Sequence, residues 1–153
     1  MLALLQRVAE ARVEVDQKVV GEIGRGLLIF LCVLKGDTEE DLRYTARKVS
    51  NLRVFEDEQG RMNLSLLDQG YEALVVSQFT LSARTRKGNR PSFDEAEEPG
   101  KAEEMYEKFI RELESLGIKT QRGLFGAMMK VYLINDGPVT IMIDSREKRR
   151  NSR

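Results

Sequence analysis

The sequence predicts a single α+β domain in which a curved, mostly antiparallel sheet of roughly eight strands is partly covered by two amphipathic helices. Three observations lead to this class. Several segments alternate apolar and polar residues as half-buried strands do, and one run is apolar throughout, as in a strand buried on both faces. Only two segments show the helical spacing of apolar residues. Because no internal repeat and no linker precedes residue 145, we expect one domain over residues 1–145 of the 153.

The N-terminal part of the chain is predicted to form three strands joined by short turns. Residues 2–15 end in alternation, and a turn at 16–18 leads into a short strand at 19–23. After a turn at 24–26, the run 27–34 is apolar at successive positions and is typical of a strand buried on both sides. The glycines of the second turn precede a strand and not a helix, so they do not indicate a phosphate-binding loop.

A first helix is predicted from Thr38 to about Asn51. Thr38 is a suitable N-cap, and acidic residues fill the first turn, where the helix dipole favours negative charge. Leu42, Ala46 and Val49 then recur at helical spacing, so we expect this helix to bury one apolar stripe.

The middle of the chain is predicted to hold short strands and a loop. Residues 53–55 and 62–64 flank a turn, and the loop continues through residue 70. Residues 73–81 are predicted to be a strand with polar insertions, whose alternation puts Gln78 and Thr80 on one face. Polar side chains here indicate that the end of the strand is exposed to solvent or lies near a ligand. Alternatively, Thr is present because it is a good strand former, and Gln simply ends the buried part of the strand.

Residues 82–100 are predicted to form a long polar surface loop. Loops of this length are uncommon unless they are functional or disordered. The first half of the loop carries four cations, Arg84, Arg86, Lys87 and Arg90. They form either a solvated charged loop or a contact with nucleic-acid phosphates.

A second helix is predicted from Pro99, which suits the first helical turn, to the stop at Gly117. Its apolar stripe includes Met105 and Phe109. Glu98 precedes it where a small capping residue is expected. A short strand at 118–121 follows.

The last two apolar runs, 128–134 and 139–143, are predicted to be strands joined by Asn135-Asp136-Gly137-Pro138. Asp-Gly between apolar runs indicates a hairpin turn. Proline directly after the glycine fits a ladder poorly because it has no N–H, and about 5–6% of X-Pro bonds are cis. From the residues alone, the segment is either a plain turn or a specialised loop.

The composition narrows the chemistry that the chain can perform. It has no histidine, which removes the usual general base and metal ligand, and with the single Cys32 no zinc site or internal disulfide is expected. This cysteine usage fits a reducing cytoplasm. The longest apolar run has eight residues, whereas a membrane span needs about 20. We therefore expect no membrane association, and we recognise no signal peptide.

The charge is concentrated at the C-terminus. Residues 146–153 hold five Lys or Arg and one Glu, a net charge of +4, and we expect this tail to be disordered. Because the whole chain is neutral, residues 1–145 carry a net charge of −4. The body is therefore not a general cationic nucleic-acid binder, and contact with RNA has to use local patches.

Four stretches together resemble the D-aminoacyl-tRNA deacylase family: Gln6-Arg7-Val8, Ser77-Gln78-Phe79-Thr80-Leu81, Arg90-Pro91-Ser92-Phe93 and Asn135-Asp136-Gly137-Pro138-Val139-Thr140. The similarity covers residues 1 to about 144. It implies a barrel-like homodimer with outer helices and active sites at the dimer interface. It also implies hydrolysis of D-aminoacyl-tRNA, and of glycyl-tRNA mischarged on tRNA-Ala, as cytoplasmic proofreading with tRNA as partner and no cofactor.

The resemblance makes Ser77, Gln78, Phe79 and Thr80 the catalytic residues. Backbone amides around Phe79 and Thr80 would hold the ester carbonyl or its oxyanion, and the 2′-hydroxyl of the terminal adenosine would assist. Thr80 is either the nucleophile or a positioning residue. Because no base is available to activate its hydroxyl, we favour positioning.

The resemblance also assigns a substrate-selecting loop and a nucleoside pocket. A cis Gly137-Pro138 dipeptide would enter the partner's site, accept the α-amino group of a D-amino acid and reject L-residues sterically. Phe125 and Met129 would line the adenosine pocket, although such residues are also ordinary core residues. Arg7 is grouped with these two as a substrate-binding residue, and it either orients the Gly-Pro loop or is a surface charge.

Two other classes of function compete with an enzyme. One is a non-catalytic tRNA- or nucleotide-binding domain that kept the fold. The other is an interaction module in which Gly137-Pro138 serves only dimer assembly. The presence of both motif stretches favours the enzyme, because a scaffold needs neither of them.

Overall fold

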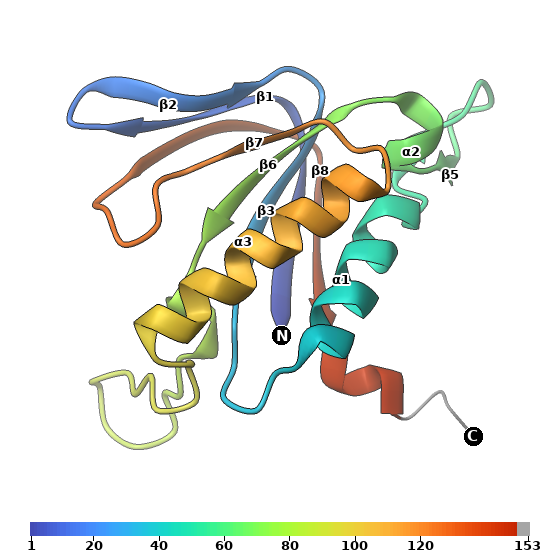
Figure 1. Cartoon of the computed structure of the whole chain (residues 1–153). Helices are drawn as coiled ribbons and strands as arrows, with labels where there is room; N and C mark the ends of the chain where they lie inside the picture. Colours follow the sequence, from blue (N-terminus) through green and yellow to red (C-terminus); the bar gives the residue numbers. More distant parts are fainter. Residues whose placement is uncertain (150–153) are drawn as a thin grey trace.

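A computed structural model describes residues 1–149, and their strands form a six-stranded mixed sheet and a separate two-stranded sheet (Figure 1). The eight strands are β1 (Leu2–Val15), β2 (Lys18–Ile23), β3 (Gly26–Cys32), β4 (Phe55–Glu56), β5 (Met62–Leu64), β6 (Glu72–Ser77), β7 (Thr120–Arg122) and β8 (Lys130–Asp144). The predicted α+β class is thus confirmed, with a nearly closed, barrel-like sheet.

The long strand β1 organises this sheet. It pairs antiparallel with β8 along most of its length, and with β3 and then β2 along its other edge. Beyond β3, the strands β6 and β7 continue in parallel. The curvature brings β2 back against β7, where a Cβ added to Gly21 would lie 2.3 Å from the carbonyl oxygen of Arg122. Only glycine permits this close approach of the two backbones.

Two long helices, α1 (Glu39–Asn51) and α3 (Pro99–Ser115), lie side by side on one face of the sheet (Figure 1). Thr38 begins α1 as predicted, and its N–H donates to the Asp41 carboxylate at 2.9 Å. Glu98 does cap α3 despite its size. Its carboxylate accepts from the N–H groups of Gly100 at 3.1 Å and Lys101 at 2.6 Å, which satisfies free donors of the first turn.

The sheet is apolar on both faces, as the run 27–34 predicted. Leu27, Ile29 and Leu31 of β3 pack in one cluster with the buried stripes of α1 and α3. Leu28 packs on the opposite side in a second cluster, formed with apolar residues of β1, β2 and β6. Helices thus cover one face of the sheet. The other face is enclosed because the sheet curves and its own strands pack against one another there.

The hairpin predicted at residues 135–138 is wrong. Both apolar runs belong to the single strand β8, which pairs with β1 before and after the interruption. Thr140 lies opposite Gln6, whereas Asn135 lies opposite Val8, so β8 has three residues more than β1 between these pairs. The Asp-Gly-Pro segment therefore lies in an enlarged bulge within β8. The local turn signal could not reveal that one partner strand serves both halves.

Two predictions in the middle of the chain also need correction. The strand predicted for 73–81 ends at Ser77, and the 3₁₀ helix η1 (Phe79–Ser82) follows it. The predicted loop before Gly70 contains the short helix α2 (Leu66–Gln69), closed by reciprocal bonds between Ser65 and Asp68 at 2.8 and 3.0 Å. Both elements are too short for apolar periodicity to reveal them.

The C-terminus packs onto the body through the 3₁₀ helix η2 (Ser145–Arg149). The Lys148 ammonium pairs with Asp41 of α1, and the Ser145 hydroxyl donates to the same carboxylate at 2.9 Å. The part of the predicted disordered tail that the structure describes, 146–149, is therefore helical. Residues 150–153 lie outside the described residues.

The carboxyl of Asp41 has a pKa below its usual range. Burial alone would raise this pKa, but bonds from the Lys148 ammonium, the Thr38 N–H and the Ser145 hydroxyl outweigh that effect. Within residues 1–149, no helix is long and apolar enough to cross a membrane.

Candidate functional site

The predicted catalytic stretch lies where β6 ends. The N–H of Gln78 donates to the Leu31 carbonyl at 2.8 Å, which is the last bond between this strand and β3. The chain then turns into η1, so Phe79 and Thr80 project from a strand end and not from a continuous strand. This geometry agrees with the solvent-exposed strand end that the polar residues indicated.

The first two amides of η1 are available to a ligand. The N–H of Leu81 donates to the Gln78 carbonyl, and that of Ala83 to the Thr80 carbonyl. Within residues 1–149, the N–H groups of Phe79 and Thr80 donate to no protein acceptor, as expected at the start of a helical turn. Two adjacent free amides of this kind can hold a carbonyl oxygen that gains negative charge.

Gln78 and Thr80 face one another even though the strand does not extend through them. The side-chain amide of Gln78 donates to the Thr80 hydroxyl, and the Thr80 side chain is exposed. An amide donor cannot remove the proton of a hydroxyl, so this contact orients Thr80 without activating it as a nucleophile. The pair can position a water molecule or a substrate hydroxyl.

The Arg90–Phe93 stretch meets this turn through two aromatic rings. Phe79 and Phe93 form an edge-to-face pair with ring centroids 5.2 Å apart, and the Phe79 side chain is 56% exposed. The carbonyl of Phe79 accepts from the Ser82 hydroxyl at 2.8 Å. Two of the stretches that carry the family resemblance therefore lie at one place in the fold.

The bulge of β8 presents Gly137 and Pro138 to solvent, and their peptide bond is cis. The φ angle of Gly137 is +130°, a backbone conformation that residues other than glycine rarely adopt. The base of the bulge is fixed by Asn135, whose side-chain amide donates to the Thr140 hydroxyl at 3.0 Å and whose side-chain oxygen accepts from the Val139 N–H at 3.2 Å.

Arg7 supports the bulge from below. Its guanidinium donates to the Asp136 carbonyl at 3.0 Å and to the Val54 carbonyl at 2.8 Å, and the residue is only 7% exposed. The carboxylates of Glu56 and Asp136 lie farther away, each at 3.9 Å. The alternative that Arg7 is a surface charge is therefore wrong. The side chain is buried and contacts the Gly-Pro bulge.

The segment that holds Phe125 and Met129 lies beside the end of β6. The N–H of Gly123 donates to the Val75 carbonyl at 3.0 Å, two residues before Ser77. Phe125 packs toward α3, with its ring centroid 5.7 Å from that of Tyr106, whereas Met129 packs in the second cluster. Both side chains therefore contribute to core packing, and both are only partly buried.

The catalytic stretch and the Gly-Pro bulge are far apart within one chain. Ser77 pairs with Leu31, which pairs with Ala3, whereas the bulge leaves β8 between the partners of Gln6 and Val8. Three strand spacings of about 4.8 Å and about four residues at 3.3 Å give a separation on the order of 20 Å along the sheet. One copy of the chain therefore does not bring the two motifs together.

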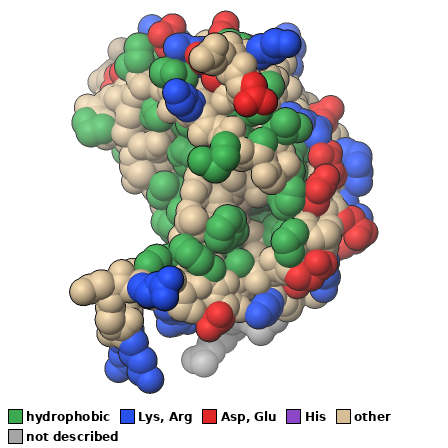
Figure 2. Space-filling view, turned by 90° about the vertical axis from the view of Figure 1, so that its left-hand side faces the viewer, with side chains coloured by type: hydrophobic (Ala, Val, Ile, Leu, Met, Phe, Trp, Pro, Cys, Tyr) green, Lys and Arg blue, Asp and Glu red, His purple; other side chains and the backbone are tan. Residues whose placement is uncertain are grey.

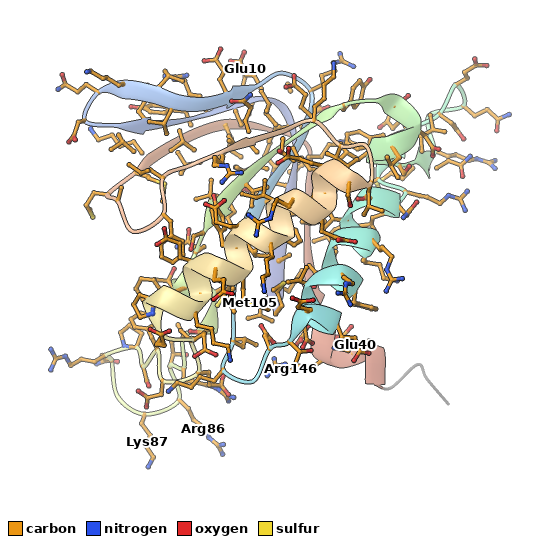
Figure 3. The ribbon with its side chains drawn as sticks, viewed as in Figure 1. Glu10, Glu40, Arg86, Lys87, Met105 and Arg146 are labelled. Atoms are coloured by element: carbon orange, nitrogen blue, oxygen red, sulfur yellow. The ribbon has the colours of Figure 1, made fainter. Side chains whose placement is uncertain are left out.

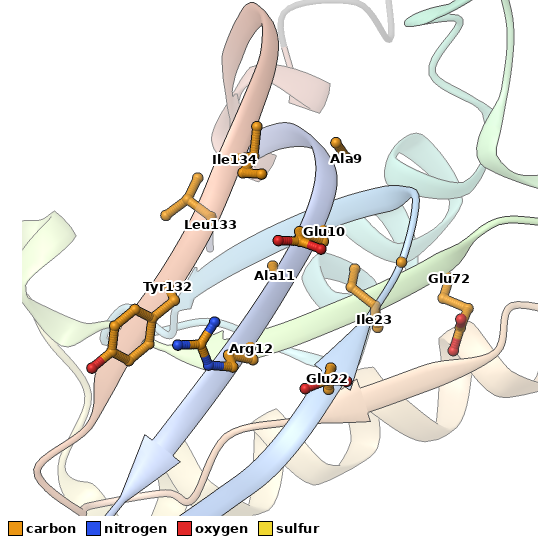
Figure 4. A pocket seen from close by; sticks show the side chains of 11 residues that line it. Ala9, Glu10, Ala11, Arg12, Glu22, Ile23, Glu72, Tyr132, Leu133 and Ile134 are labelled. Carbon is orange, nitrogen blue, oxygen red and sulfur yellow. The ribbon is translucent and has the colours of Figure 1, made fainter. Parts of the chain in front are cut away.

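An open groove lies elsewhere on the sheet, between β1, β2 and β8 (Figure 4). The Arg12 guanidinium carbon lies 4.0 Å from the centroid of the Tyr132 ring, and Ile134 is 52% exposed on the same strand. The groove contains none of the predicted site residues. A smaller hollow beside the bulge does include Arg7 and Gly137.

The chain matches known proteins over almost its whole length. The model of the D-Tyr-tRNA(Tyr) deacylase family matches residues 4–144. The D-aminoacyl-tRNA deacylase of Aquifex aeolicus (strain VF5) is 58% identical over 96% of this chain and 99% of its own. That of Roseiflexus castenholzii (strain DSM 13941 / HLO8) is 59% identical over 95% of this chain and 92% of its own.

Solved structures agree with the fold. That of a c-Myc DNA unwinding element binding protein has a TM-score of 0.90 and 42% identity, over 94% of this chain and 98% of the other. The structure of a probable eukaryotic D-amino acid tRNA deacylase has a TM-score of 0.82 and 18% identity, over 93% of this chain and 97% of the other. The second likeness concerns the fold alone. The family match and the full-length relatives together establish that this chain belongs to the D-Tyr-tRNA(Tyr) deacylase family.

Proposed function

We propose that the chain hydrolyses the ester bond of D-aminoacyl-tRNA and releases a free D-amino acid and tRNA. The observation that carries this proposal is the family match over residues 4–144, which spans both the Ser77–Thr80 turn and the Gly-Pro bulge. Glycyl-tRNA mischarged on tRNA-Ala is a second substrate, because glycine has no side chain for a chirality filter to reject. The reaction is a proofreading step in translation, and we assign it to the cytoplasm.

In the proposed reaction, water adds to the ester carbonyl carbon, and the carbonyl oxygen becomes negatively charged. The free N–H groups of Phe79 and Thr80 stabilise that oxygen. The intermediate then collapses, the bond between carbon and ribose oxygen breaks, and the ribose oxygen takes up the proton that the attacking water gave up. The side chains of Gln78 and Thr80 orient the water together with the neighbouring 2′-hydroxyl of the substrate.

Chirality is selected in this proposal by the backbone of Gly137 and Pro138. Their carbonyl oxygens accept the α-ammonium group, so the side chain of a D-residue points away and that of an L-residue collides with the backbone. A filter of this kind needs a rigid backbone. The bonds from Arg7 and Asn135 supply a fixed base for the bulge.

The proposed site is shared between two copies of the chain. The separation on the order of 20 Å within one copy supports this arrangement, because the bulge then reaches the catalytic turn of a partner. The outer face of β8 also exposes a row of apolar side chains, Tyr132, Ile134 and Met142, at 39%, 52% and 47%. Such a row is typical of a surface that another protein covers.

The test is hydrolysis of matched D- and L-tyrosyl-tRNA by the purified protein in the presence of a chelator. Release from the D-ester alone supports both the activity and the filter. Equal release from both esters contradicts the role of Gly137 and Pro138, and release from neither contradicts the enzyme. In a second arm, Pro138→Ala should lose hydrolysis and remain a dimer by light scattering. Monomers that still hydrolyse the ester would assign the bulge to assembly.

A second candidate is a non-catalytic nucleic-acid-binding domain. The likeness to a c-Myc DNA unwinding element binding protein, at 42% identity, favours it. The same hydrolysis assay separates the two candidates, because this domain would bind tRNA and release no amino acid from either ester.

A further inference from the structure

The loop that follows the catalytic turn forms a defined projection. Arg84 and Ser92 exchange two backbone bonds, at 2.8 and 2.9 Å, so they close a loop of the seven residues 85–91. The Arg84 guanidinium also binds both oxygens of Glu95, at 2.9 and 2.5 Å. We name residues 85–91 the basic arm. Figure 2 shows a projection from the lower edge of one face of the molecule that carries Lys and Arg side chains.

Three cations at the end of the basic arm have no acidic partner. Arg86, Lys87 and Arg90 are exposed, and within residues 1–149 none of them forms an ion pair. Arg86 and Lys87 point away from the body (Figure 3). Arg84 differs from them because Glu95 neutralises it. The arm therefore presents about three positive charges that the protein itself does not balance.

The acidic residues that follow the arm are mostly engaged elsewhere. Glu95 binds Arg84, Glu97 lies 3.5 Å from Lys101, and Glu98 caps α3. These contacts hold the carboxylates at the base of the arm, away from its tip. Because the three exposed cations lie within residues 86–90 of one loop, their charges add to a local positive patch that attracts a polyanion.

The basic arm is attached directly to the proposed site. Phe93, two residues after the arm, supports the exposed ring of Phe79 at 5.2 Å between centroids. From Phe93 to Arg90 the chain spans at most about 10 Å. An exposed aromatic ring beside free cations is the combination that binds single-stranded nucleic acid, because bases stack on the ring while the cations meet phosphates.

We propose that Arg86, Lys87 and Arg90 bind the phosphodiester backbone of the RNA substrate close to its aminoacylated 3′ end. This inference rests on the proposed function, since it takes tRNA as the substrate. Arginine and lysine are the side chains that most often contact phosphates, and such contacts fix position without reading sequence. The arm therefore increases affinity for tRNA of any sequence and does not take part in the chemical step.

The first experiment measures binding of deacylated tRNA between 50 and 200 mM salt. It compares the wild type with the triple variant Arg86→Gln/Lys87→Gln/Arg90→Gln. Each phosphate contact contributes about 0.7 to 0.9 to the slope of log K against log salt, so the variant's slope should be shallower by about 2 to 3. Over this range, wild-type affinity should fall about 20- to 40-fold more than that of the variant.

A matched variant separates the basic arm from general surface charge. Arg47→Gln/Arg61→Gln/Lys119→Gln removes the same charge from exposed positions on α1, in the turn before β5 and just before β7. It should keep the wild-type slope. Equal slopes for all three proteins, or equal losses in both variants, would overturn the proposal. Equal urea midpoints exclude misfolding as the cause of a loss.

A second readout uses D-tyrosyl-tRNA and the D-tyrosyl ester of adenosine, which has no phosphate. For the arm variant, the ratio of kcat/KM between the tRNA ester and the adenosine ester should fall at least tenfold. An unchanged ratio contradicts the proposed role of the basic arm in binding tRNA. If the wild type hydrolyses neither ester, the proposed function fails while the tRNA-binding slopes still test the arm. Loss of binding to phosphatidylserine vesicles with an unchanged tRNA slope would assign the arm to a membrane surface and refute the proposal.

Discussion

Replacing Arg7 with alanine should destabilise the protein and loosen the Gly-Pro bulge together. The guanidinium joins the bulge to another part of the chain, through Asp136 on one side and Val54 on the other. Alanine would leave both carbonyl oxygens without this donor. The perturbation therefore tests whether Arg7 fixes the bulge or merely fills space beneath it.

The size of the effect follows from the two bonds. A hydrogen bond to a charged group contributes about 1.5 to 3 kcal/mol. The bond to the Val54 carbonyl is buried and should contribute its full free energy, whereas water can partly replace Arg7 at the Asp136 carbonyl, where the bond is only part-buried. The carboxylates of Glu56 and Asp136 are more than half exposed at 3.9 Å and add little. We expect Arg7→Ala to lower the free energy of unfolding by about 2 to 4 kcal/mol.

The assay is urea unfolding at a fixed protein concentration, since a dimer's stability depends on concentration. With a slope of about 2 kcal/mol per molar urea, the midpoint should fall by roughly 1 to 2 M. Arg47→Ala is the control, because it removes an exposed guanidinium of α1 whose contact with the Arg43 carbonyl, at 3.4 Å, is itself exposed, and it should leave the midpoint nearly unchanged. Equal midpoints for the two variants would refute the reasoning. The preference for D- over L-tyrosyl-tRNA should also fall in Arg7→Ala alone.

Three further changes test other contacts. Gly21→Ala should cost about 1 to 3 kcal/mol of stability because its Cβ meets the Arg122 carbonyl, whereas Gly24→Ala has open space and should cost far less; equal urea midpoints would contradict this. Asp41 has a depressed pKa, so its stabilisation is complete above about pH 5 and is lost on further acidification. Asp41→Asn should therefore show a flatter fall of stability between pH 5 and pH 2 in urea titrations, and parallel curves would argue against it. Thr80→Ala should keep a measurable rate of D-tyrosyl-tRNA hydrolysis, which would exclude an obligatory acyl-threonine intermediate, whereas complete loss in a folded dimer would contradict the positioning role.

Local sequence signals predicted the elements that local interactions determine. Thr38 and the acidic residues after it marked the start of α1, and they bond there as a cap would. The uniformly apolar run 27–34 indicated burial on both faces, and β3 indeed contributes to both apolar clusters. In each case, the side chain and its partner lie close together in the chain, or only the polarity of the surroundings matters.

The errors concern pairing between distant segments. Asp136-Gly137 carries a strong hairpin signal, yet β1 is long enough to pair with the chain on both sides of it. A turn signal reports a local preference and cannot tell which strand will be the partner. The role of Arg7 was open for the same reason, since its two acceptors lie 47 and 129 residues away.

One missed element did have a readable signal. Ser65 and Asp68 have the spacing of a capping box, and they close α2 through two reciprocal bonds. A four-residue helix buries too little to show an apolar stripe, so only the capping pattern could have found it.

The Gly-Pro bulge combines two properties that rarely occur together in a loop. Gly137 and Pro138 are exposed, and exposed loops are usually the most mobile parts of a fold. Here the backbone on both sides of the dipeptide is bonded, by Arg7 at Asp136 and by Asn135 at Val139. A chirality filter requires this combination, because the dipeptide has to reach a ligand outside its own chain and still hold two carbonyl oxygens in fixed positions. If Arg7 or Asn135 is removed, the bulge should keep its reach and lose its selectivity, so hydrolysis of L-tyrosyl-tRNA should rise relative to that of the D-ester.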